Sequence, residues 1–128
     1  MNPVLSTALS GLTAATKRIG VSANNIANAL TSRPTTAGAP APAGTFAAQE
    51  VTQRSVAGGG VSAEVRDKDP ATVTGVDPSS PTGLSAFPNV DFAEEAVNQI
   101  VAVNLYRANA AVIRVQQEID DALLDIET

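Results

Sequence analysis

The sequence predicts a mainly α-helical protein, in which two long terminal helices form an antiparallel coiled coil with a small irregular β-hairpin and loop region between them. Three observations predict this class. Near each end of the 128-residue chain, apolar residues recur at alternating intervals of four and three, the spacing of a coiled-coil seam. The middle is rich in proline and glycine, which interrupt helices. The two ends also carry opposite charge, which favours their pairing.

Residues 1–31 are expected to form the first coiled-coil helix. Asn2 is suited to cap its start and Pro3 to occupy its first turn. Gly11 and Gly20 each cost about 1 kcal/mol relative to alanine, so the helix needs a partner to be stable. Its seam, with one polar position at Thr16, consists of Leu5, Leu9, Leu12, Thr16, Ile19, Ala23, Ile26 and Leu30.

The middle of the chain divides into two segments. Residues 32–45 have the proline, glycine, alanine and threonine content of a flexible linker. Residues 46–88 are expected to form a short β-hairpin followed by turns. The hairpin is predicted by two β-type runs on either side of three glycines at 58–60, and the turns by Asp69-Pro70 and Asp77-Pro78.

Residues 89–128 are expected to form the second coiled-coil helix, which Asn89 or Asp91 can cap. One interval of eleven residues early in its stripe predicts local unwinding of the supercoil. Asp120, Asp121, Asp125 and Glu127 are acidic residues at the C-terminal end of this helix, where the helix dipole disfavours them. A basic partner is therefore expected in an assembled state. The stripe consists of Val97, Val101, Leu105, Ala108, Val112, Val115, Ile119, Ala122 and Ile126.

Several kinds of chemistry are excluded by composition. The chain has no cysteine and no histidine, which removes disulfides, thiolate nucleophiles, imidazole bases and the usual zinc ligands. The acidic pairs Glu94-Glu95 and Asp120-Asp121 diverge by about 100° on a helix, so neither converges on a substrate. The three glycines lack the lysine and the following helix of a phosphate loop. We therefore expect no enzymatic activity, no cofactor and no metal.

Other partners are excluded by the distribution of charge and hydrophobicity. No basic face is concentrated enough to bind nucleic acid, and no stretch reaches the roughly 20 apolar residues that cross a bilayer. Neither helix has the strongly basic polar face of a membrane-surface helix. Residues 1–20 also lack the basic and continuous apolar regions of a cleavable signal peptide, so we expect none.

Two motifs, one near each end, resemble those of a known family. Residues 10–31 are similar to the N-terminal signature of bacterial flagellar axial proteins, and their core reads Ala23-Asn24-Asn25-Ile26-Ala27-Asn28. Residues 88–109 are similar to the C-terminal signature of the same proteins. The chain thus resembles the flagellar basal-body rod protein family. The short middle, with Asp77-Pro-Ser-Ser-Pro81, places the resemblance closest to the proximal rod members.

This resemblance implies a structural subunit of the proximal rod, in the periplasmic part of the flagellar basal body. Its partners would be copies of itself and other rod subunits, assembled into a helical tube that transmits torque. The flagellar type III apparatus would export it without cleavage. No nucleic acid, small-molecule substrate or direct membrane insertion is implied. The alternative is a soluble coiled-coil binding or adaptor protein of a secretion-related complex.

The residues expected to mediate assembly come from the two stripes and the two motifs. An apolar residue of either stripe belongs equally well to an intramolecular core or to a contact between subunits. Asn24, Asn25 and Asn28 are poor helix formers, and the resemblance favours hydrogen bonds from them to neighbouring helices. Tyr106 and Asn109 are expected to form an interface pair. The full set is Leu5, Leu9, Leu12, Ile19, Asn24, Asn25, Ile26, Asn28, Val97, Val101, Leu105, Tyr106, Asn109, Val112, Val115 and Ile119.

Overall fold

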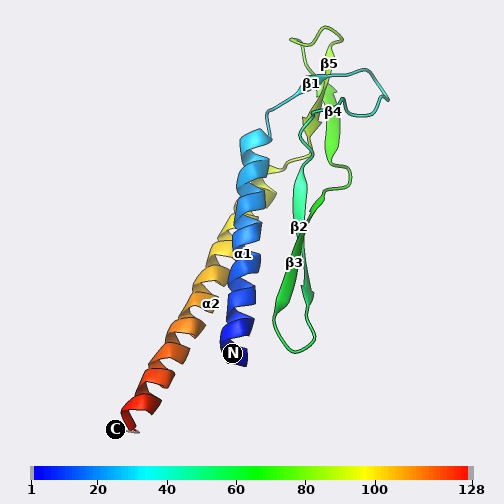
Figure 1. The fold of residues 1–128 in the computed structure, drawn as a ribbon. Coiled ribbons are helices and arrows are strands. Elements are labelled where there is room, and N and C mark those ends of the chain that lie inside the picture. The colour runs from blue at the N-terminus through cyan, green and yellow to red at the C-terminus, as the bar shows by residue number, and fades with distance from the viewer. Residues whose placement is uncertain (1, 127–128) are drawn as a thin grey trace.

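A computed structural model describes residues 2–126, in which a helix at each end flanks five short strands (Figure 1). The elements, in order, are α1 (Pro3–Asn28), β1 (Arg33–Pro34), β2 (Gln49–Ser55), β3 (Val61–Asp67), β4 (Thr72–Val76), β5 (Leu84–Pro88) and α2 (Phe92–Ile126). The expectation of a mainly α-helical protein is wrong, because the middle of the chain forms two antiparallel sheets. The protein is of the mixed α and β class.

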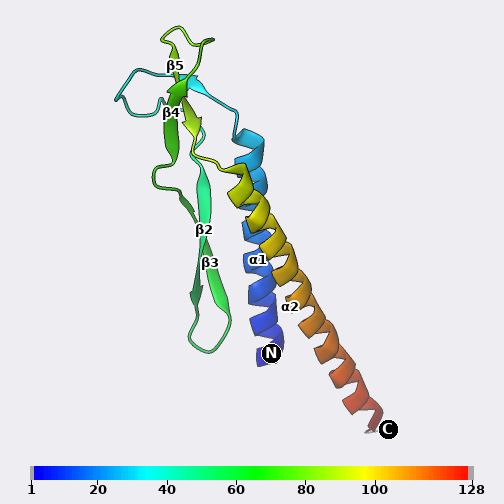
Figure 2. The same ribbon diagram turned by 180° about the vertical axis from the view of Figure 1, so that it is seen from behind.

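The two helices lie side by side and run in opposite directions (Figures 1 and 2). The caps follow the sequence signals: the Asn2 side chain accepts a hydrogen bond from the Val4 N–H at 3.0 Å, and Asp91 Oδ1 accepts one from the Ala93 N–H at 2.8 Å. The C-terminal end of α2 projects past the start of α1 (Figure 1). The last two residues of the predicted second helix, 127 and 128, lie outside the described residues.

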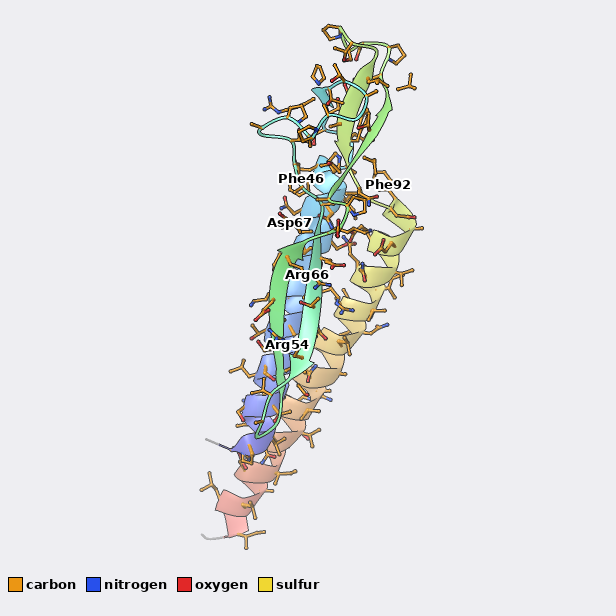
Figure 3. The ribbon with its side chains drawn as sticks, turned by 90° about the vertical axis from the view of Figure 1, so that its right-hand side faces the viewer. Phe46, Arg54, Arg66, Asp67 and Phe92 are labelled. Carbon is orange, nitrogen blue, oxygen red and sulfur yellow. The ribbon has the colours of Figure 1, made fainter. Side chains whose placement is uncertain are left out.

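Strands β2 and β3 form the hairpin that the glycines at 58–60 predict. Gln49 pairs with Asp67 at one end of the hairpin and Ser55 with Val61 at the other. All three glycines have positive φ, which residues with a side chain rarely adopt. Figure 3 shows the hairpin lying over α1, with Arg54 and Arg66 on it.

The other three strands form a sheet in the order β1–β5–β4, beyond the C-terminal end of α1 (Figure 1). Both pairs are antiparallel, and β5 is the central strand. These strands occupy parts of the chain where a linker and turns were expected. The strands are short and separated by strong turn signals. In addition, β1 pairs with a strand about fifty positions later, which no local pattern reveals.

The core of the molecule is built from small side chains. Among the described residues, the buried apolar side chains are those of Pro88 and of eight alanines: Ala8, Ala14, Ala15, Ala29, Ala48, Ala63, Ala86 and Ala102. Alanine buries little surface, so this core supplies less hydrophobic stabilisation than one made of leucine or phenylalanine. The large apolar side chains are instead left partly or largely exposed.

Gly20 offers a simple test of the α1 description. It is exposed in the helix interior, and a β-carbon there would meet nothing within 4 Å. Gly20→Ala should therefore raise the free energy of unfolding by about 1 kcal/mol in urea denaturation. At Gly11 a β-carbon would lie 2.5 Å from Asn109 Oδ1. Gly11→Ala should thus lower the free energy of unfolding by about 1 kcal/mol. An equal increase for both variants would contradict the described packing.

The Asp77 carboxylate holds the turn between β4 and β5 through hydrogen bonds. We therefore expect the stability of this sheet to fall in acid. The carboxylate accepts hydrogen bonds from the Ser79 hydroxyl at 2.5 Å and the buried Ser85 hydroxyl at 2.7 Å, which lower its pKa. The stabilisation is therefore complete above the ordinary aspartate pKa of 3.8 and is lost as pH falls toward the lowered value. Asp77→Asn should show a smaller fall in melting temperature between about pH 6 and about pH 2. An unchanged acid slope would contradict this role.

Candidate assembly surface

The two helices contact each other through small and polar side chains. On α1, residues at intervals of seven are buried: Ala8, Ala15, Ser22 and Ala29. The Ser22 hydroxyl donates to the backbone carbonyl of Glu95 at 3.0 Å, and Gly11 lies against the side chain of Asn109. Small side chains let the helix axes approach closely. The helix contact therefore does not follow the predicted seam of large apolar residues, which is shifted around α1.

Asn25 joins three elements of the fold. It is 1% exposed, and its side-chain amide donates to the Gln49 carbonyl at 2.7 Å and to Glu95 Oε1 at 2.6 Å. Its carbonyl oxygen accepts the Gln49 N–H at 3.0 Å. The amide thus pairs with the edge of β2 as a further strand would, while it also satisfies the buried carboxylate of α2. Asn25 is the residue of the asparagine motif that bonds across elements.

Two more α1 side chains hold the other edge of the hairpin. Ser10 Oγ accepts the Val61 N–H at 3.0 Å, and Lys17 Nζ donates to the Ala63 carbonyl at 2.8 Å. Ser10, Lys17 and Asn25 are seven and eight positions apart, so they share one face of α1. The side chains on this face form hydrogen bonds with backbone groups that an edge strand otherwise leaves unpaired.

An ion pair links the end of the hairpin to the start of α2. Lys68 Nζ lies 2.7 Å from Glu94 Oε2. This hydrogen bond, with the charge of the carboxylate, raises the pKa of Lys68 although partial burial opposes the shift. The Lys68 side chain is about one quarter exposed, so it remains charged at neutral pH. The pair therefore helps to fix the hairpin against α2.

The predicted stripe of α2 is exposed along its length. Val112 is 44% exposed, and no other element of residues 2–126 covers the stripe beyond the start of α1. Leu105 borders a hollow with Gln53, Gly60 and Val61, so this stripe lies on the hairpin side of the helix pair. The exposed large apolar side chains on α2 are Phe92, Val97, Ile100, Val101, Leu105, Tyr106, Val112, Val115, Ile119, Leu123, Leu124 and Ile126.

Most of the predicted stripe of α1 lies away from the face that holds the hairpin, but Leu9 borders a hollow that β3 also lines. The half-buried members of the stripe are Leu5, Leu12, Ile19 and Ile26, and its exposed members are Leu9, Thr16, Ala23 and Leu30. Leu9 is 55% exposed. The only charged side chains of α1 are Lys17 and Arg18, and neither falls on this stripe. The stripe is therefore an uncharged surface along the whole helix.

The remaining predicted residues differ in their surroundings. Asn24 and Asn28 bond to each other within α1, since Asn28 Nδ2 donates to the Asn24 carbonyl at 2.9 Å. Asn109 donates to the Leu105 carbonyl at 2.8 Å and lies against Gly11 on the helix contact. Tyr106 is 44% exposed. Asn109 thus belongs to the intramolecular contact, whereas Tyr106 remains available to another chain.

Some residues that hold this arrangement together were not predicted as such. They are Ser10, Gly11, Lys17, Ser22 and Glu95. The small residues of α1 do recur every seven positions, which is a readable signal, but the leucine and isoleucine spacing is stronger and hides it. Nothing local indicates the role of Glu95, because its partners lie on α1 and β2.

Neither a metal site nor a membrane span is found among residues 2–126. Residues 2–126 contain no group of three or more carboxylate side chains placed to hold a metal ion. Neither α1 nor α2, over the same residues, combines the length and the apolar character needed to span a bilayer.

The fold and its exposed stripes define the class of elongated structural proteins built on paired terminal helices. Two family models match the chain. Residues 5–35 match the family described as flagella basal body rod protein, and residues 83–126 match the one described as flagellar basal body rod FlgEFG protein C-terminal. The chain is therefore a member of the flagellar basal-body rod protein family. No match was found among curated proteins.

Membership in this family defines the coarse function. The chain is a structural rod protein of the flagellar basal body, which assembles with other basal-body components. The family as a whole is not enzymatic. The two matched segments contain α1 and α2 almost completely, so the family likeness lies in the helices that carry the exposed stripes.

Proposed function

We propose that this chain is a subunit of the proximal rod, which assembles with copies of itself and with other rod subunits into a helical tube that transmits torque. The observation that supports this most directly is the exposed apolar stripe of α2, together with the stripe of α1, which is only partly covered. Each large apolar side chain gains about 1.5–3 kcal/mol when it is fully buried. Contiguous exposed apolar surface of this extent marks contacts with other chains.

The placement of the stripes favours an open assembly. Apart from Leu9, the α1 stripe faces away from the hairpin, whereas the α2 stripe lies on the hairpin side. A subunit that binds its neighbours through two different faces makes heterologous contacts, which propagate into rings or helical filaments. In this proposal residues 1–31 and 89–128 form the tube contacts, while 32–45 and 46–88 link and brace them.

Charge gives the C-terminal end of α2 a preferred environment. Glu118, Asp120 and Asp121 make the C-terminal part of α2 acidic, and Glu118 Oε1 lies 3.8 Å from Arg114 Nε. In this part of the helix, beyond the start of α1, a neighbouring chain is required to cover the apolar side chains. We propose that the neighbour that covers them also brings basic groups to these carboxylates.

The position in the rod and the route to it are further parts of the proposal. The short middle containing Asp77-Pro-Ser-Ser-Pro81 is similar to the proximal rod protein FlgC, which supports the proximal position. Export would occur through the flagellar type III apparatus without a cleavable signal. The soluble adaptor is the second candidate, since paired helices with exposed stripes suit it as well.

The proposal can be tested by isolating basal bodies from cells that make an epitope-tagged chain. The chain should remain with the rod after membranes and soluble components are removed, and its deletion should abolish motility. An adaptor would be lost during this purification. Absence of the chain from purified rods would contradict the proposal, whatever the effect of the deletion on motility.

A further inference from the structure

The outer edge of β4 presents backbone groups without partners. The Asn89 N–H donates to the Ala71 carbonyl at 3.0 Å, and the Asp77 N–H donates to the Gly83 carbonyl at 3.0 Å. The antiparallel ladder alternates, so Val73 and Gly75 also bond to β5. The N–H and C=O groups of Thr72, Thr74 and Val76 therefore point outward, and nothing in residues 2–126 bonds to them.

The other sheet edges of the molecule are protected. The opposite edge of this sheet is β1, which is two residues long, contains a proline and lies beside residues 44–46 of the loop that follows it. The hairpin edges are bonded to α1 at Gln49, Val61 and Ala63. The hairpin also carries the ion pairs Arg54–Glu64 and Arg66–Glu50. Charges, prolines and covering segments are the usual ways in which proteins block strand addition.

The β4 edge has none of these protections. Its sequence, Thr-Val-Thr-Gly-Val, contains no charge and no proline, and three of its five residues are exposed, with Val76 at 80%. Such an edge is complementary to one kind of partner, an extended uncharged strand whose own backbone groups complete the ladder.

We propose that β4 accepts an extended, uncharged strand from a neighbouring subunit of the rod, so that the three-stranded sheet becomes continuous between chains. This inference rests on the proposed function. Two copies of β4 would pair about a twofold axis, which closes a dimer and cannot propagate along a polar tube. A strand contributed by the next subunit forms a heterologous contact, as the stripes on the helices do.

Hydrogen exchange compared between the free subunit and isolated rods tests this without a mutation. On assembly the backbone amides of Thr72, Thr74 and Val76 should exchange at least about tenfold more slowly. Slower exchange of α1 and α2 with unchanged β4 would overturn the strand contact and leave the proposed function intact. Unchanged exchange throughout would overturn both.

A proline substitution isolates the outward groups. Thr74→Pro removes an N–H that points away from β5, so the inner ladder bonds of Val73 and Gly75 are kept. The variant should fold, as shown by exchange protection at those two residues, and yet be absent from purified rods. Thr74→Val keeps the N–H and should enter rods normally. Normal incorporation of the folded proline variant would overturn the proposal.

The same position distinguishes the neighbouring strand from a second copy of β4. The chain has no cysteine, so Thr74→Cys introduces a single thiol. Twofold pairing of β4 would bring two such thiols together, and disulfide-linked dimers of the free subunit would form under mild oxidation. We expect the variant to stay monomeric, and efficient dimer formation would overturn the assignment to a neighbouring subunit.

Discussion

Replacement of Asn25 by alanine should lower the free energy of unfolding by about 3–5 kcal/mol. The change leaves the N–H and carbonyl of Gln49 without the partner that pairs with them, and it removes a donor from the buried carboxylate of Glu95. Each buried polar group that loses its partner costs about 1–3 kcal/mol. Urea denaturation of the isolated subunit measures the loss. Exchange at Gln49 should accelerate as the hairpin separates from α1.

Asn28→Ala is the matched control, because Asn28 lies on the same helix and bonds only to Asn24 within it. Its effect should stay within about 0.5 kcal/mol. Similar losses for the two variants would contradict the assignment of Asn25 as the side chain that joins α1, β2 and α2.

Val112→Asp should abolish incorporation of the subunit into rods and, with it, motility. Val112 is 44% exposed in the free subunit, so aspartate is tolerated there and the free energy of unfolding should change by no more than about 0.5 kcal/mol. In the assembled state the same side chain would be a buried, unpaired charge, which costs several kcal/mol at every subunit contact. Immunoblots of purified basal bodies and swimming assays measure the effect.

Gln117→Asp provides the control for position on the helix. Gln117 is exposed on α2 and points about 140° away from Val112, on the face opposite the stripe. It adds an acidic side chain outside the stripe, so rods should form. If both variants assemble, the α2 stripe is not a contact between subunits. If both fail, the defect does not depend on the stripe.

The sequence predicts the helices well because their signals are local. Asn2, Asp91 and the long apolar periodicities determine where α1 and α2 form, and the glycines at 58–60 predict the hairpin between β2 and β3. The three-stranded sheet could not be predicted in the same way. Strands β4 and β5 are five residues each between turn signals, and β1 finds its partner only in the folded chain.

The helix contact shows why the largest apolar residues are a poor guide here. Gly11 and Ser22 meet α2, and small residues at such positions allow a close approach that leucine would prevent. The heptad of large residues is a real feature of the sequence, but within one subunit it stays largely uncovered. That outcome is consistent with a chain whose stronger seams are completed by other subunits.

The asparagine motif was predicted as a group, and the structure separates its members. Asn25 is buried and bonds to α2 and β2, whereas Asn24 and Asn28 bond to each other on the surface of α1. Helical periodicity shows that Asn25 lies on a different face from Asn24 and Asn28. It does not show which of these faces contacts another element. The partner of Asn25 includes the backbone of Gln49, which carries no sequence signal at all.

The central claim is that the stripes on α1 and α2 are covered by neighbouring rod subunits. Cryo-electron microscopy of isolated basal bodies, at a resolution that traces side chains, tests it most directly. We expect density for this chain within the rod, with Leu9 and Val112 both buried against helices of adjacent subunits. Density that leaves either stripe facing solvent, or a rod that lacks this chain, would contradict the claim.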